Sequence, residues 1–74
     1  MPTVKRFSNC KITVYMGDHN PPHFHIVGVD FDALVEIATL QVIRGNASTA
    51  KEALQWAAAN LDVIRSEWER LNGC

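Results

Sequence analysis

Residues 23–37 read HFHIVGVDFDALVEI, an alternation of apolar and polar side chains that is interrupted at Asp30. Because successive side chains of a β-strand point to opposite faces, this pattern predicts two strands, at 23–29 and 31–37. One face of each strand should be buried and the other should face outward. The side chains expected to point inward are Phe24, Ile26, Phe31, Ala33, Val35 and Ile37, and those expected to point outward are His23, His25, Val27, Asp32, Leu34 and Glu36.

Other short segments extend this strand pattern along the chain. TVKRF at 3–7 and KITVYM at 11–16 are separated by a short polar break, which favours a hairpin. Downstream, a tight turn at 38–39 would lead into a short fifth strand at 40–43, LQVI. A longer, curved fourth strand would give the same pattern, so four or five strands are expected.

The hydrophobic period changes to about 3.6 residues near the C-terminus, which predicts a helix at 49–72. Thr49 with Glu52 three residues later is a capping box, and Gly73 can end the helix. Asn60 could divide the helix by capping a second segment, but the apolar stripe keeps its register through it. One helix, straight or kinked, is therefore predicted, with a stripe formed by Ala50, Ala53, Leu54, Ala57, Leu61, Ile64, Trp68 and Leu71.

These elements predict an α+β fold, in which an antiparallel sheet of four to five strands carries one long C-terminal helix on one face. The 74 residues are expected to form a single domain, 1–74, with strands from about 3 to 43 and a helix from about 49 to 72. Apolar residues make up 47% of the chain and charged residues 20%, a composition typical of an ordered fold. A chain of this size buries only about 60% of its unfolded surface, so a partner subunit or a metal would add stability.

The distribution of charge is more informative than the net charge of −1, which disfavours nucleic acid and anionic membranes as partners. Residues 1–17 contain three basic residues and no acid, whereas residues 18–36 contain four acids and no Lys or Arg. We expect the basic hairpin to pair across strands with the acidic one, each pair contributing a few tenths of a kcal/mol. A basic surface for nucleic acid is the alternative.

The two cysteines, Cys10 and Cys74, are too few for the disulfide framework of a small secreted domain and are expected to be free thiols. The N-terminal residues lack the apolar run of a signal peptide, and no segment approaches the roughly 20 apolar residues of a membrane span. A cytoplasmic location without membrane association is therefore expected.

All three histidines of the chain lie within DHNPPHFH, residues 18–25. In a strand, His23 and His25 project from the same face with Cα atoms about 6.6 Å apart, so two zinc ligands are available. His19 or Asp18, returned by the double proline, or Glu36 could supply a third. Three ligands with an open position would allow a bound water to be ionised for hydrolysis.

A purely structural interpretation competes with this zinc site. Histidines beside Thr13 and Tyr15 are ordinary cross-strand partners, while Pro21 and Pro22 stiffen the turn. The chain has no HExxH motif, no serine linked to a histidine by a recognisable pattern and no glycine-rich phosphate loop. A histidine near Asp18 could act as a general acid or base, although no substrate pocket is evident.

The chain resembles the small bacterial proteins of domain-of-unknown-function family 4160. The resemblance rests on MPTV at 1–4, DHNPPHFH at 18–25, EIATLQVIRG at 36–45 and a C-terminal helix with Trp56 and Trp68. The positions that match the family's most specific segment are Asp18, His19, Pro21, Pro22, His23 and His25. Val27–Gly28 and Ser48–Thr49 stand where members often carry a Tyr-Gly pair and a proline before the helix.

The resemblance implies no established reaction. It implies that the chain is one half of a two-gene module with a toxin–antitoxin or regulatory role. The other half would be a second small protein encoded beside it. We therefore expect a non-enzymatic interaction module that binds such a partner, with a homodimer as a further arrangement. Its recognition surface would combine the loop and the outward sheet face, with Tyr15, Asp18, His19, Pro21, Pro22, His23, His25 and the apolar anchor Trp56.

Two other functions stay open on the sequence. The first is a metal-dependent hydrolase or nuclease that uses His19, His23 and His25 with zinc as its metal, whereas no cofactor is predicted for the favoured interaction module. The second is a DNA-binding regulator, which the near-neutral charge disfavours. Trp56 also has a structural interpretation, as the edge of a broad core face, because it lies about 80–100° around the helix from the main stripe.

Overall fold

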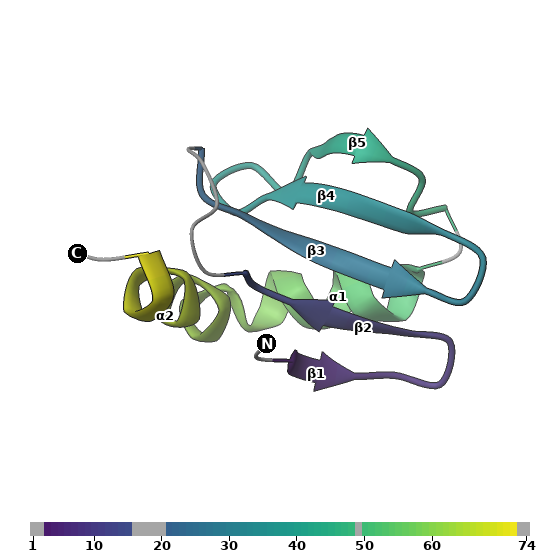
Figure 1. The fold of residues 1–74 in the computed structure, drawn as a ribbon, viewed down its shortest axis with the longest axis horizontal. Helices are drawn as coiled ribbons and strands as arrows, with labels where there is room; N and C mark the ends of the chain where they lie inside the picture. The colour runs from purple at the N-terminus through teal and green to yellow at the C-terminus, as the bar shows by residue number, and fades with distance from the viewer. Residues whose placement is uncertain (1–2, 16–20, 49, 73–74) are drawn as a thin grey trace.

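The computed structural model describes residues 3–15, 21–48 and 50–72. Five antiparallel strands form one sheet in the order in which they occur in the chain; in the view of Figure 1 the first helix lies behind the sheet and the second lies beside its left end. The predicted α+β class is confirmed. The strands are β1 (Thr3–Arg6), β2 (Cys10–Thr13), β3 (His23–Gly28), β4 (Asp32–Glu36) and β5 (Val42–Gly45), and the helices are α1 (Lys51–Ala59) and α2 (Leu61–Asn72).

The register of the central strands follows the alternation of the sequence. On β3, Ile26 lies opposite Ile12 of β2 and opposite Ala33 of β4, and Phe24 lies opposite Val35. All five of these side chains are buried. Because residues directly opposite one another in a sheet share a face, the inward side chains of three strands form one continuous apolar surface.

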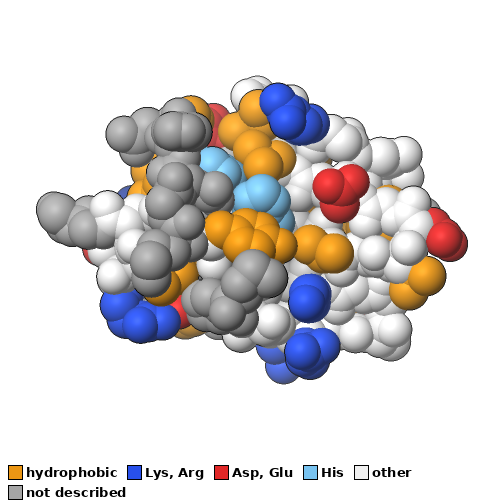
Figure 2. Space-filling view, in the orientation of Figure 1, with side chains coloured by type: hydrophobic (Ala, Val, Ile, Leu, Met, Phe, Trp, Pro, Cys, Tyr) orange, Lys and Arg blue, Asp and Glu red, His pale blue; other side chains and the backbone are white. Residues whose placement is uncertain are grey.

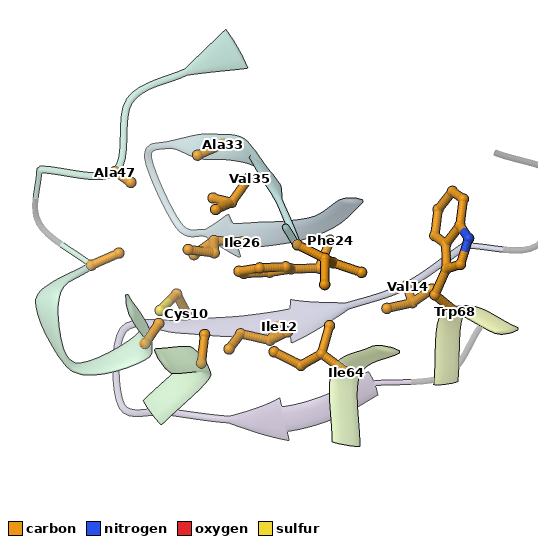
Figure 3. Packing of buried hydrophobic residues seen from close by; sticks show 14 residues of the cluster. Cys10, Ile12, Val14, Phe24, Ile26, Ala33, Val35, Ala47, Ile64 and Trp68 are labelled. Carbon is orange, nitrogen blue, oxygen red and sulfur yellow. The ribbon is translucent and has the colours of Figure 1, made fainter. Parts of the chain in front are cut away.

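The helices cover this apolar surface. Ile64 and Trp68 of α2 point toward Val14, Phe24 and Ile12, as Figure 3 shows. Burial of a phenylalanine or isoleucine side chain contributes roughly 1.5–3 kcal/mol. The buried core is completed by alanines of α1 and the loop before it, and consists of Cys10, Ile12, Val14, Phe24, Ile26, Ala33, Val35, Ile37, Ala47, Ala50, Ala53, Ala57, Ile64 and Trp68.

The prediction of one long C-terminal helix is wrong, because the chain forms two helices that separate at Asn60. The backbone of Asn60 leaves the helical region, with φ −131° and ψ 34°, and its N–H bonds the Ala57 carbonyl three residues back. The Asn60 side chain donates to the Trp56 carbonyl at 2.8 Å, and the Asn60 carbonyl accepts from Ile64 in α2. Asn60 thus hydrogen-bonds backbone groups of both helices at the break, while the apolar stripe continues across it.

The fifth strand exists, but it runs over 42–45 rather than the predicted 40–43. The turn after β4 is longer than two residues, since Leu40 adopts a left-handed conformation with φ 62° and its N–H bonds the Glu36 carbonyl. A residue in that conformation cannot continue an extended strand. The strand ends at Gly45, where φ is 84° and a Cβ atom would lie 2.2 Å from the Asp32 carbonyl oxygen.

The remaining boundaries differ from the predictions by small amounts. β2 begins one residue earlier than predicted and ends at Thr13. α1 begins at Lys51 with Ala50 at the N-cap position. The predicted capping box requires Thr49, which lies outside the described residues. Neither α1 nor α2, the two helices of the described chain, is both long and apolar enough to cross a membrane.

Candidate functional site

The helices leave one side of the sheet uncovered, and we call it the open face. Figure 2 shows this side, where histidine side chains lie among hydrophobic ones. Its residues follow from the register, because each lies opposite another outward side chain on the next strand or continues the same alternation. The open face consists of Arg6, Lys11, Thr13, Tyr15, His23, His25, Val27, Asp32, Leu34, Glu36 and Arg44.

His23 is the first residue of β3 and is buried, with 8% of its surface exposed. Its Nδ1 lies 2.7 Å from the backbone oxygen of Pro21. A carbonyl oxygen can only accept, so Nδ1 is the donor in this hydrogen bond. The ring also lies 5.1 Å from the ring of Trp68 in α2. His23 therefore stands at the boundary between the open face and the helical layer.

His25 lies on the open face itself and is half-buried. It is opposite Thr13 on β2 and Leu34 on β4. The Tyr15 ring meets it edge-on at 4.5 Å between centroids, and the His23 ring lies 5.2 Å away. The structure thus brings three of the predicted site residues, Tyr15, His23 and His25, into one aromatic cluster.

The double-proline turn lies next to this cluster and is held in place by hydrogen bonds. Pro21 and Pro22 are exposed and have no N–H to donate, but both carbonyls accept hydrogen bonds. The Pro21 oxygen accepts from His23 and the Pro22 oxygen from the N–H of Ile37, at 3.1 Å. The turn is therefore attached to β3 by a side chain and to the end of β4 by the backbone.

The predicted zinc site is represented in the structure by two of its three histidines. His23 and His25 are close together, whereas Asp18 and His19 lie outside the described residues. Among the residues that are described, no group of three His, Cys, Asp or Glu could hold a metal ion. Glu36 is opposite His23, but its Oε1 accepts a hydrogen bond from the Thr39 hydroxyl at 2.7 Å.

The charges of the open face do not pair as expected. The basic hairpin does pair with the acidic one, through β2 and β3, but among the described residues their charges are not opposed as predicted, because Arg6 lies opposite Lys11 and Lys11 lies opposite Val27. Asp32 is the next residue of this row, on β4. Farther along, a hollow of about 170 Å³ is lined by His25, Asp32, Ala33, Leu34, Arg44 and Gly45.

Two residues discussed in the sequence belong to the other side of the sheet. Trp56 on α1 is half-buried and meets the Phe7 ring edge-on at 6.3 Å, so the structure does not bring it to the open face. Cys10 is a free, buried thiol, and burial together with the carboxylate of Glu52 raises its pKa above the ordinary value of 9.0. Cys74 is outside the described residues.

The ways in which several residues position the cluster were not predicted from the sequence. Thr13 faces outward yet is only 1% exposed, and Trp68 supplies the ring beside His23. The Asn72 side chain donates to the backbone oxygen of Tyr15 at 3.2 Å, which ties the end of α2 to the chain after β2. The sequence placed Thr13 beside the histidines, but no local signal could indicate contacts between residues 57 positions apart.

Fold and site together define a small α+β domain, a five-stranded antiparallel meander backed by two helices with a histidine and tyrosine cluster on its open face. The chain belongs to the family described as domain of unknown function DUF4160, whose sequence model matches residues 10–69. The resemblance noted from the sequence is thereby confirmed. None of the curated proteins and none of the solved structures compared with the chain matches it.

Proposed function

We propose that this chain is a cytoplasmic protein-interaction module that binds a small protein partner through its open face. The family resemblance implies the form of the pair, toxin–antitoxin-like or regulatory. The supporting observation is the composition of the open face, where Tyr15, Val27 and Leu34 are half-buried on the side that the helices do not cover. A solvated sheet face usually carries polar side chains, whereas an apolar and aromatic centre with charges at its rim is typical of an interface.

The other outward features fit a docking surface better than an enclosed catalytic site. The hollow beside His25 holds about 170 Å³, less than the roughly 300 Å³ or more that small-molecule pockets typically offer. On the adjoining strand β5, Arg44 is exposed opposite Leu34, so a charge lies at the rim of the open face. Tyrosine and histidine rings that are locked against each other lose little conformational entropy when a partner covers them.

The proposal is tested by co-expression with the product of the adjacent gene, followed by purification of the complex. Leu34→Lys places a charge in the centre of the open face and should abolish the complex. Val63→Lys is the matched control, since Val63 is 45% exposed on α2 and belongs to the helical layer. A chain that never forms a stable complex, or a Leu34→Lys variant that binds as well as the wild type, would contradict the proposal.

A zinc-dependent hydrolase or nuclease is the second candidate, and one contact favours it. Histidines that bind metals usually donate their second ring nitrogen to a carbonyl or carboxylate, which fixes the ring, and His23 makes such a bond to Pro21. His25 is adjacent, and the sequence offers His19 as the third ligand. Zinc titration into untagged protein should give one ion per chain and no binding in His25→Ala. Absence of stoichiometric zinc binding by the wild type would exclude this candidate.

A further inference from the structure

One row of side chains across the open face has opposite charges at its two ends. Lys11 on β2 lies opposite Val27 on β3, and Val27 lies opposite Asp32 on β4. The row is therefore basic, apolar and acidic, with Val27 at its centre. Lys11 and Asp32 are two strands apart, about 10 Å at the usual strand spacing. No ion pair joins them within the described residues.

This row is complementary to itself. Consider a two-fold axis that lies above β3 and runs parallel to the strands. Rotation by 180° about this axis exchanges the positions of β2 and β4. If the open face of a second copy is stacked on the first by this operation, Lys11 of each copy lies over Asp32 of the other, and the two Val27 side chains meet at the axis. Stacked sheets are about 10 Å apart, a gap that a lysine and an aspartate together can span.

The next row is compatible with the same arrangement. Thr13, His25 and Leu34 are opposite one another on β2, β3 and β4. The two-fold operation places Thr13 over Leu34 of the second copy and the two His25 rings near the axis. No like charges of lysine, arginine or acid are opposed in these two rows. We propose that the open face binds a second copy of this chain, forming an isologous dimer held by two Lys11–Asp32 ion pairs around Val27.

The edges of the sheet are less suited to self-association than its face. The pairing of β1 shifts register between Thr3 and Lys5, and the pairing of β5 shifts between Leu34 and Val35. Such bulges twist an edge strand and disfavour the addition of another strand. β1 also carries two exposed cations next to each other, Lys5 and Arg6. A second copy would therefore pack on the open face rather than extend the sheet.

The dimer rests on the proposed function in one respect, that the open face is a protein-binding surface. It goes beyond that function because the occupant is the chain itself, which would compete with a partner of different sequence. The face of a five-stranded sheet is small by the standards of permanent dimers, so a reversible dimer with a micromolar dissociation constant is expected.

Charge reversal tests the dimer by sedimentation velocity on the full chain. Lys11→Asp and Asp32→Lys should each raise the dissociation constant at least about tenfold, because each reversal replaces two ion pairs by two repulsions. An equimolar mixture of the two variants should regain the dimer, since each contact between positions 11 and 32 of the mixed dimer again joins a lysine to an aspartate. Lys51→Asp is the control, with the same charge change at the start of α1, and it should dimerise like the wild type.

Each outcome decides the proposal. A wild type that stays monomeric at about 1 mM, where even a binding free energy of about −4 kcal/mol would be detected, overturns it. Single variants that dimerise normally, or a mixture that stays monomeric while circular dichroism shows both variants folded, also overturn it. Asp32 is exposed, so Asp32→Lys keeps the test valid if Lys11→Asp does not fold. A wild-type chain that stays monomeric on its own but forms the co-expressed complex would refute this inference and leave the proposed function standing.

Discussion

His23 and His25 are two residues apart, yet the structure gives them different energetic roles. His23 is only 8% exposed. His23→Ala removes its 2.7 Å hydrogen bond to the Pro21 oxygen and its ring contact with Trp68. The hydrogen bond contributes about 1 kcal/mol and the ring contact about 0.5–1.5 kcal/mol. With the cavity that alanine leaves, the free energy of unfolding should fall by roughly 2–3 kcal/mol.

His25→Ala is the comparison, because His25 is half-buried and its ring contacts lie on the open face. Its loss should lower the free energy of unfolding by about 0.5–1 kcal/mol. Urea denaturation of both variants, followed by circular dichroism and extrapolated to zero denaturant, gives the two values. Equal losses, or a larger loss for His25→Ala, would refute the assignment of His23 as the anchor of the double-proline turn.

Three further predictions use the same unfolding measurements or thiol chemistry. Gly45→Ala should lower the free energy of unfolding by at least about 2 kcal/mol in urea, because φ is 84° and the new Cβ would lie 2.2 Å from the Asp32 oxygen. Asn60→Ala should cost about 1 kcal/mol in the same assay, since the Trp56 carbonyl loses its side-chain donor. In a Cys74→Ser background, native Cys10 should react with a thiol reagent at about pH 8 far more slowly than in urea. Because its pKa is raised in the folded state, Cys10 should contribute stability below pH 9.0 that is lost as the pH rises above that value, which urea titrations at several pH values would show.

The strand faces could be predicted because the sheet is buried on one side only. A shift of one residue would move Phe24, Ile26 and Val35 into water, so alternation specifies both the strands and their inward side chains. The sequence therefore predicted the core of the sheet and identified Tyr15 and His25 as outward. The same periodicity could not locate strand ends, because Leu40 takes a left-handed conformation that is uncommon for leucine.

The parts that could not be predicted depend on contacts between distant segments. His23 was assigned to the outward face by alternation, but at the start of β3 its ring also reaches Trp68 on α2, 45 residues later in the chain. The apolar stripe of the helix runs through Asn60 without a change of register, so periodicity alone favoured a single helix. The break is decided by backbone hydrogen bonds at one residue, which a hydrophobic pattern does not contain.

The described helices are short, and they cover only one side of the sheet. With 9 and 12 residues, α1 and α2 are about 14 and 18 Å long, enough to cover one side of the central strands. The described chain contains no further helix or strand that could lie on the other side. Val27 and Leu34 are half-buried on the open face, and a second polypeptide packed there would remove more of their surface from water. Substitution of either by threonine should leave the core intact while weakening association, which separates the energetics of folding from those of binding.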